Sequence, residues 1–155
     1  MALLLTIGCK NDMNSLEKGD PAAARKVLIA GTTSEFKQNV VDRVIEKLGV
    51  EDCYFKITGL DQLNKEEIDQ FDAILLVARF AAGRMDGRVT RFLEKYPANE
   101  KTVVFFTRGS EDTDIPEWAK PEIRVDAVTS ASLTDLVDDR ADEIVSLIKN
   151  RLYAQ

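Results

Sequence analysis

The sequence predicts an α/β domain, with a doubly wound parallel sheet of five strands between two layers of helices. Two observations predict it. Apolar runs suited to strands alternate along the chain with segments whose apolar residues recur at helical spacing, a pattern typical of a parallel sheet covered on both faces. The strand candidates also differ in texture, meaning that some are apolar throughout and others alternate between apolar and polar side chains. This difference indicates where each strand lies in the sheet.

Five strand candidates can be ordered by this texture. Residues 27–30, 73–78 and 102–107 are continuous runs, as in strands buried on both faces. Residues 53–57 and 123–127 alternate between apolar and polar side chains, which suits edge strands. The order 2-1-3-4-5 places the alternating strands outside. A ligand site is then expected beyond the carboxyl ends of strands 1, 3 and 4.

Three segments have the apolar spacing of helices. They are residues 40–48, ended by Gly49, residues 89–96, ended by Pro97, and residues 133–152, opened by Ser132. Only about fourteen residues remain between the fourth and fifth strands, which is near the minimum for a parallel crossover. We therefore expect a shortened crossover there, in which Trp118 covers the flank of the sheet or, alternatively, stacks on a bound ring system.

Composition excludes several functional classes. The net charge of −6 argues against a nucleic-acid binder, which needs clustered Lys and Arg. Histidine is absent, so His-based triads and His metal sites are excluded. Two cysteines are too few for a disulfide framework or a zinc site, and Cys53 is predicted to face the core. We predict no catalytic residue, no metal site and no transmembrane segment.

The first 24 residues are predicted to be an arm or tether, and residues 25–155 the domain. Residues 1–9 form a short apolar run that ends in Gly8-Cys9 and resembles a bacterial lipobox, although Thr6 and the lack of basic residues depart from that signal. Two alternatives stay open. The segment is either a frayed arm of a cytoplasmic protein or part of a lipoprotein anchored to a membrane through Cys9.

Residues 71–85 carry the most specific motif. Asp72 opens an apolar strand, and a small-residue turn then leads to Gly83-Arg84-Met85. This stretch resembles the flavodoxin family, and in particular the branch that contains menaquinone-dependent protoporphyrinogen oxidase. The resemblance extends over nearly all of residues 26–152. It implies a flavodoxin-like fold, FMN as cofactor, and electron transfer or quinone-type redox chemistry with a redox partner protein.

Loop 1, residues 31–39, falls where flavodoxins carry a phosphate loop of the form S/T-x-T-G-x-T. Phe36 replaces its glycine, and Glu35 adds a negative charge beside the phosphate position. One interpretation is a modified loop that still accepts an anion. The other is a plain strand–helix connection with Ser34 as N-cap. If the loop binds phosphate, the resemblance implies these contacts: Thr32, Thr33, Ser34, Lys37 and Gln38.

Two further loops complete the candidate site. By resemblance, loop 2 lies along the flavin ring, with Phe80 either stacking on the ring or closing the core. Loop 3 begins at Arg108 and Gly109. Arg79, Arg84 and Arg108 would form a basic rim that favours an anionic ligand or a more easily reduced flavin, unless they are ordinary surface arginines. The candidate residues of loop 2 are Arg79, Phe80, Ala81, Ala82 and Gly83.

Two functions therefore compete. The first is an FMN-binding domain for electron transfer or quinone-type redox chemistry. The second is a flavodoxin-like module without flavin that binds a partner or a small anion, with or without a membrane tether.

Overall fold

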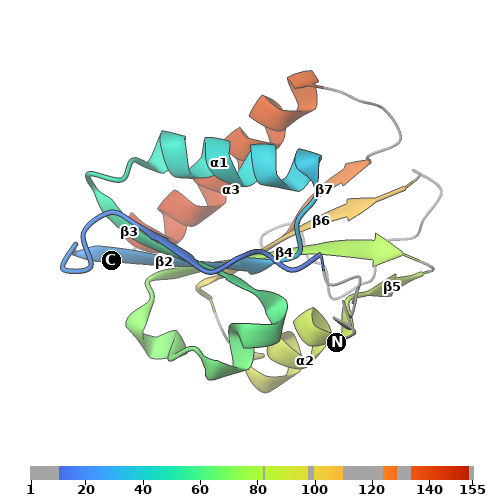
Figure 1. Cartoon of the computed structure of the whole chain (residues 1–155), viewed down its shortest axis with the longest axis horizontal. Helices are drawn as coiled ribbons and strands as arrows, with labels where there is room; N and C mark the ends of the chain where they lie inside the picture. Colours follow the sequence, from blue (N-terminus) through green and yellow to red (C-terminus); the bar gives the residue numbers. More distant parts are fainter. Residues whose placement is uncertain (1–10, 82, 98–99, 110–123, 129–133, 154–155) are drawn as a thin grey trace, which may run out of the picture.

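The structure is a computed structural model that describes residues 11–81, 83–97, 100–109, 124–128 and 134–153. Strands and helices alternate, as the sequence predicts (Figure 1). In chain order the elements are β1 (Leu16–Lys18), β2 (Arg25–Gly31), α1 (Glu35–Leu48), β3 (Cys53–Gly59), the 3-10 turns η1 (Leu60–Lys65) and η2 (Ile68–Gln70), β4 (Ala73–Ala81), β5 (Arg84–Met85), α2 (Gly87–Lys95), β6 (Thr102–Arg108), β7 (Arg124–Val128) and α3 (Thr134–Tyr153).

The sheet is mostly parallel, which confirms the predicted class. Its strands follow the order β1-β3-β2-β4-β6-β7, and β5 pairs with β4. Over the described residues the sheet has seven strands rather than five, because β1 adds an antiparallel edge beside β3 and β5 forms a hairpin with β4. Strand β3 is therefore not an edge strand. Neither β1, with three residues, nor β5, with two, is long enough to show a periodic pattern.

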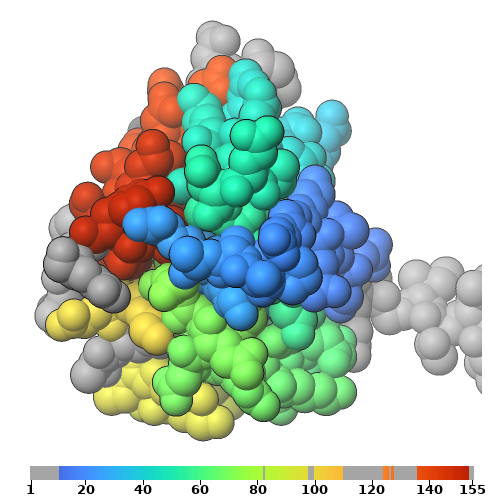
Figure 2. Space-filling view, turned by 90° about the vertical axis from the view of Figure 1, so that its left-hand side faces the viewer, coloured from blue at the N-terminus to red at the C-terminus, as the bar shows by residue number. Residues whose placement is uncertain are grey.

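Each face of the sheet has its own core. Side chains alternate along β2, so that Val27 and Ile29 join the core under α1 and α3, while Leu28 and Ala30 join the core under η1, η2 and α2. This double burial explains the continuous apolar runs. Figures 1 and 2 show the resulting three layers, with α1 and α3 on one side of the sheet and the η1-to-α2 region on the other.

The helix boundaries follow local capping chemistry. The Ser34 hydroxyl accepts a hydrogen bond from the Lys37 amide at 3.2 Å at the start of α1, and Gly49 ends that helix with φ 86°. At the start of α2 the Asp86 carboxylate accepts from the Arg88 amide at 2.9 Å. The predicted start of the last helix at Ser132 and the crossover that contains Trp118 lie outside the described residues.

Residues 11–18 are part of the folded unit rather than a frayed arm. They contribute β1, a bridge between Asp12 and Thr32, and the side chain of Met13, which is 5% exposed and packs in the core under α1. We therefore extend the domain back from residue 25 to Asn11. Cys9 lies outside the described residues, so the lipid anchor stays a prediction. Among the described residues, no helix is long and apolar enough to cross a bilayer.

Candidate functional site

The candidate site lies where β2 and β4 end, side by side and in the same direction. Gly31 closes β2 at this point. A Cβ atom added there would lie 2.6 Å from the Cβ of Val77, so only glycine lets the two strand ends approach this closely. The loop that follows, residues 32–34, leads directly into α1 at the sheet edge where ligands of doubly wound folds bind.

The polar groups of loop 1 bond largely to one another and to the N-terminal segment. The Thr32 amide donates to the Val77 carbonyl at 2.9 Å, and the Thr33 amide donates to the carbonyl of Asn11. The Thr33 hydroxyl donates to the Gln38 side-chain oxygen at 3.3 Å. Ser34 is the N-cap of α1. The structure thus contains the capped strand–helix connection that was one of the two interpretations of this loop.

Lys37 is the least expected feature of the site. Its side chain is 5% exposed, and its Nζ donates to the Thr32 hydroxyl at 2.8 Å. Burial lowers the pKa of Lys37, the nearby Arg79 guanidinium lowers it further, and Asp86 opposes both effects. An ammonium group has three donors. Hydrogen bonding among the described residues accounts for one of them, so Lys37 retains capacity to bind an anion.

Phe36 and Glu35, which depart from the flavodoxin pattern, belong to the first turn of α1. The half-buried ring of Phe36 packs against the core, with its centroid 6.4 Å from that of Phe105. Glu35 is exposed, at a helix N-terminus where a negative charge is favourable. Both residues therefore have structural reasons for their positions, although Glu35 disfavours an anionic ligand at the same helix end.

A network of ion pairs borders loop 1. Arg88 donates from Nη1 to Asp12 Oδ2 at 2.8 Å, and from Nη2 to Asp86 Oδ2 at 2.8 Å. The bonds from Arg88 hold the pKa of Asp86 below its usual range. The sequence analysis missed this network, because Asp12 and Arg88 are 76 positions apart and neither belongs to a motif. The one available signal was Asp86, an N-cap residue type directly before a predicted helix.

Within the described residues, only part of the hydrogen-bonding capacity of the Asp12 carboxylate is used. The side chain is 9% exposed, and its buried Oδ1 atom has no hydrogen-bond partner among the described residues. A buried carboxylate oxygen without a donor is unfavourable. Because the Asp12 backbone pairs with Thr32, this acceptor adjoins the residue that receives the Lys37 hydrogen bond.

Loop 2 forms the hairpin between β4 and β5. Arg79 is exposed near the end of β4. Phe80 is 3% exposed, and its ring centroid lies 5.9 Å from that of Phe106, so its side chain closes the core under α2. Ala81 pairs with Arg84, and Gly83 makes the turn with φ 73°. Ala82 lies outside the described residues.

The other two members of the predicted arginine rim lie nearby. Arg84 is exposed on β5. Arg108, half-buried, ends β6, the strand beside β4, and Gly109 follows it at the surface. Arg79 and Arg108 thus lie near the carboxyl ends of the neighbouring strands β4 and β6, and Arg84, the first residue of β5, pairs with Ala81 at the end of β4. Arg108 also interacts within the chain, so it does not serve as a spare cation.

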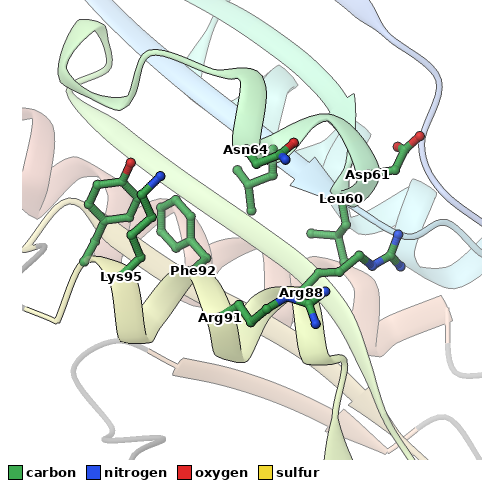
Figure 3. A pocket seen from close by; sticks show the side chains of 9 residues that line it. Leu60, Asp61, Asn64, Arg88, Arg91, Phe92 and Lys95 are labelled. Atoms are coloured by element: carbon green, nitrogen blue, oxygen red, sulfur yellow. The ribbon is translucent and has the colours of Figure 1, made fainter.

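A separate pocket of about 200 Å³ lies between η1 and α2 (Figure 3). Leu60, Leu63 and Phe92 line it with buried apolar surface, and Lys95 and Phe92 lie at the opposite end from Asp61. The sequence analysis did not anticipate it. Arg88 lines this pocket and also binds Asp12, so one side chain joins the pocket to the N-terminal segment.

Comparisons with solved structures identify the fold. The flavodiiron core Flv1 from Synechocystis sp. PCC6803 superposes with a TM-score of 0.60 at 14% identity, covering 86% of this chain and 38% of that one. Rubredoxin oxygen:oxidoreductase from Desulfovibrio gigas gives 0.56 at 13% identity, covering 88% and 38%. Oxidised flavodoxin 2 from Bacillus cereus gives 0.53 at 12% identity, covering 81% and 99%. The fold is flavodoxin-like.

The comparisons do not define a particular member of that class. No protein-family profile and no curated protein matches the chain by sequence. The chain spans little more than a third of the Flv1 and rubredoxin oxygen:oxidoreductase structures, and at these identities the likeness extends to the fold alone. The resemblance of loop 2 to the protoporphyrinogen oxidase branch receives no support from these matches.

Proposed function

We propose that this chain is an FMN-binding electron-transfer domain. The observation that carries the proposal is the buried Lys37 ammonium, which lies at the switch point of a flavodoxin-like sheet with donors to spare. A buried cation is costly unless it is compensated. An anionic group at the end of β2 would provide that compensation, and the flavodoxin-like fold supports the choice of a flavin phosphate as that group.

The donor set of the described residues fits a phosphate in part. Lys37 Nζ and the amides of Glu35 and Phe36 would hold the phosphate, since the Lys37 amide already donates to Ser34, and Arg79 would lie toward the ring. Glu35 opposes it through its charge, and the Thr33 amide is already bonded to Asn11. When bound, FMN supplies the capacity to accept and pass on electrons. The protein contributes anion binding and the positive field of Lys37 and Arg79.

Titration of FMN into the full-length chain tests the proposal. We expect quenching of flavin fluorescence as FMN binds, and an affinity at least about tenfold weaker in Lys37→Met, since a charge-assisted contact is worth more than about 1.4 kcal/mol. Lys47→Met is the matched control, because it removes the same charge from the far end of α1. Absence of quenching at high micromolar FMN would contradict the proposal.

One observation favours the second candidate, a flavin-free module that binds a small anion or a partner. The amide and the hydroxyl of Thr33 both have partners within the chain. Binding of inorganic phosphate that depends on Lys37, together with no binding of FMN, would support this alternative. A redox partner protein remains part of the first proposal.

A further inference from the structure

Residues 11–13 lie across loop 1 and occupy part of the proposed anion site. The Met13 amide donates to the Gly31 carbonyl at 2.9 Å, and the Thr33 amide donates to the Asn11 carbonyl. These two hydrogen bonds form the bridge between Asp12 and Thr32. The N-terminal segment therefore holds the backbone on both sides of the residue that accepts the Lys37 hydrogen bond.

The groups that the segment brings to loop 1 imitate an anion. The Asn11 carbonyl accepts a hydrogen bond from a backbone amide, and the Asp12 carboxylate accepts one from the Arg88 guanidinium. Backbone amides and basic side chains are also the groups that bind phosphate oxygens. An anion at the start of α1 would compete with Asn11 for the Thr33 amide and would be repelled by Asp12.

The segment is held by apolar burial and strand pairing from Met13 onward, and by polar contacts ahead of it, namely the Thr33–Asn11 hydrogen bond and the Arg88–Asp12 ion pair. Met13 is buried in the core, and β1 pairs with β3 from Leu16 to Lys18. Ahead of Met13, Asn11 is exposed, and within the part of the chain that the structure describes the buried Oδ1 of Asp12 has no hydrogen-bond partner. Opening of residues 11 and 12 would hydrate this oxygen, so part of the cost of opening is recovered.

We propose that residues 11–13 act as an N-terminal gate over loop 1. With the gate closed, Asn11 and Asp12 occupy the site; when an anionic ligand binds, residues 11 and 12 leave and β1 remains paired. The inference rests on the proposed function for its ligand class. It adds that the apparent affinity equals the intrinsic affinity reduced by the fraction of molecules whose gate is open.

The charge of the gate can be removed with little change in shape. Asp12→Asn weakens the bond to Arg88 and removes the repulsion, so we expect phosphate and FMN to bind about tenfold more tightly, the effect of a contact worth one decade in affinity. Glu51→Gln is the matched control, because it makes the same charge change on an exposed side chain at the amino end of β3. An unchanged affinity in Asp12→Asn would overturn the gate.

Removal of charge alone also strengthens anion binding, so a second measurement must follow the gate itself. Amide NMR of the full chain, titrated with inorganic phosphate, reports on it. We expect the order parameters of Asn11 and Asp12 to fall and the exchange of the Met13 amide to speed up as phosphate saturates, while the amides of β1 stay protected. Saturation that leaves Asn11 and Asp12 ordered would overturn the gate, whatever the affinities are.

The two probes separate this inference from the proposed function. If phosphate opens the gate and FMN does not bind, the gate stands and the flavin function is wrong. If FMN binds while Asn11 and Asp12 stay ordered, the function stands and the gate is wrong. If neither probe binds to Asp12→Asn, both proposals are wrong.

Discussion

The two faces of the sheet are covered in different ways. On one face, α1 and α3, with 14 and 20 residues, pack over a core in which Phe105, Ile144 and Ile148 are fully buried. The other face is covered by α2, with nine residues, and by two 3-10 turns, and a cavity of about 200 Å³ remains between η1 and α2. Both faces bury fully inaccessible side chains, but the second face also borders a pocket near Arg88.

Large-to-small substitutions in the two cores would test this comparison most strongly. We expect Ile144→Ala to lower the free energy of unfolding by about 3–4 kcal/mol, because a well-packed site cannot collapse around the lost methyl groups. Leu63→Ala should cost about 2 kcal/mol, since Leu63 borders an existing cavity and loses fewer contacts. Urea denaturation of both variants gives the measurement, and equal losses would mean that the two faces are equally well packed.

Most of this architecture follows from local patterns that the sequence displays. Apolar runs such as residues 73–78 predict buried strands, and Gly49 marks a helix end, because both signals depend on near neighbours. The edge strand β1 could not be predicted, since its three residues, Leu16, Glu17 and Lys18, carry no period. Its stability comes from pairing with β3 and from the contact between Tyr54 and Glu17, which are distant in sequence.

The candidate site shows the same division. Ser34 as N-cap and the position of loop 1 follow from sequence spacing, because capping depends on residues only three positions apart. The burial of Lys37 does not follow from sequence spacing, since a lysine in a first helical turn is ordinarily exposed. The approach of Asp12 to Arg88 depends on where the N-terminal segment crosses the sheet, and no local signal encodes that path.

The helix caps provide a second comparison between the faces. Asp86 caps α2 and also binds the Arg88 guanidinium. For Ser34 the argument rests on its role as the N-cap of α1. We expect Asp86→Ala to cost about 1–2 kcal/mol and Ser34→Ala about 0.5–1 kcal/mol in thermal or urea unfolding.

The dependence of folding stability on pH in the acidic range provides a second test of the role of Asp86. Arg88 lowers the pKa of Asp86 in the folded state, so its contribution is complete above the ordinary value of 3.8 and is lost as the pH falls through the folded pKa. Asp86→Asn should flatten the pH dependence in that range. An acid limb as steep as that of the unmodified chain would show that other carboxylates dominate it.

Replacement of Lys37 is expected to have a small effect on stability, of opposite sign to the others. Burial of its ammonium is unfavourable, so Lys37→Met should raise the free energy of unfolding by about 1 kcal/mol, as replacement of a functional group by a packed apolar side chain often does. Lys47→Met, whose lysine pairs with Asp142 at 2.6 Å on the surface, should change it by about 0.5 kcal/mol or less.

The pH dependence of folding stability distinguishes removal of the buried Lys37 ammonium from a simple gain in apolar packing. Because the folded pKa of Lys37 is lowered from 10.5, the unfolded chain binds more protons between the folded pKa and 10.5, and stability rises with pH through that window. Lys37→Met should abolish the rise, which urea unfolding measured across alkaline pH would detect. If the variant is instead less stable at neutral pH, the ammonium holds Thr32 and the end of β2 in place. The proposal that Lys37 is retained for an anionic ligand would then lose its main support.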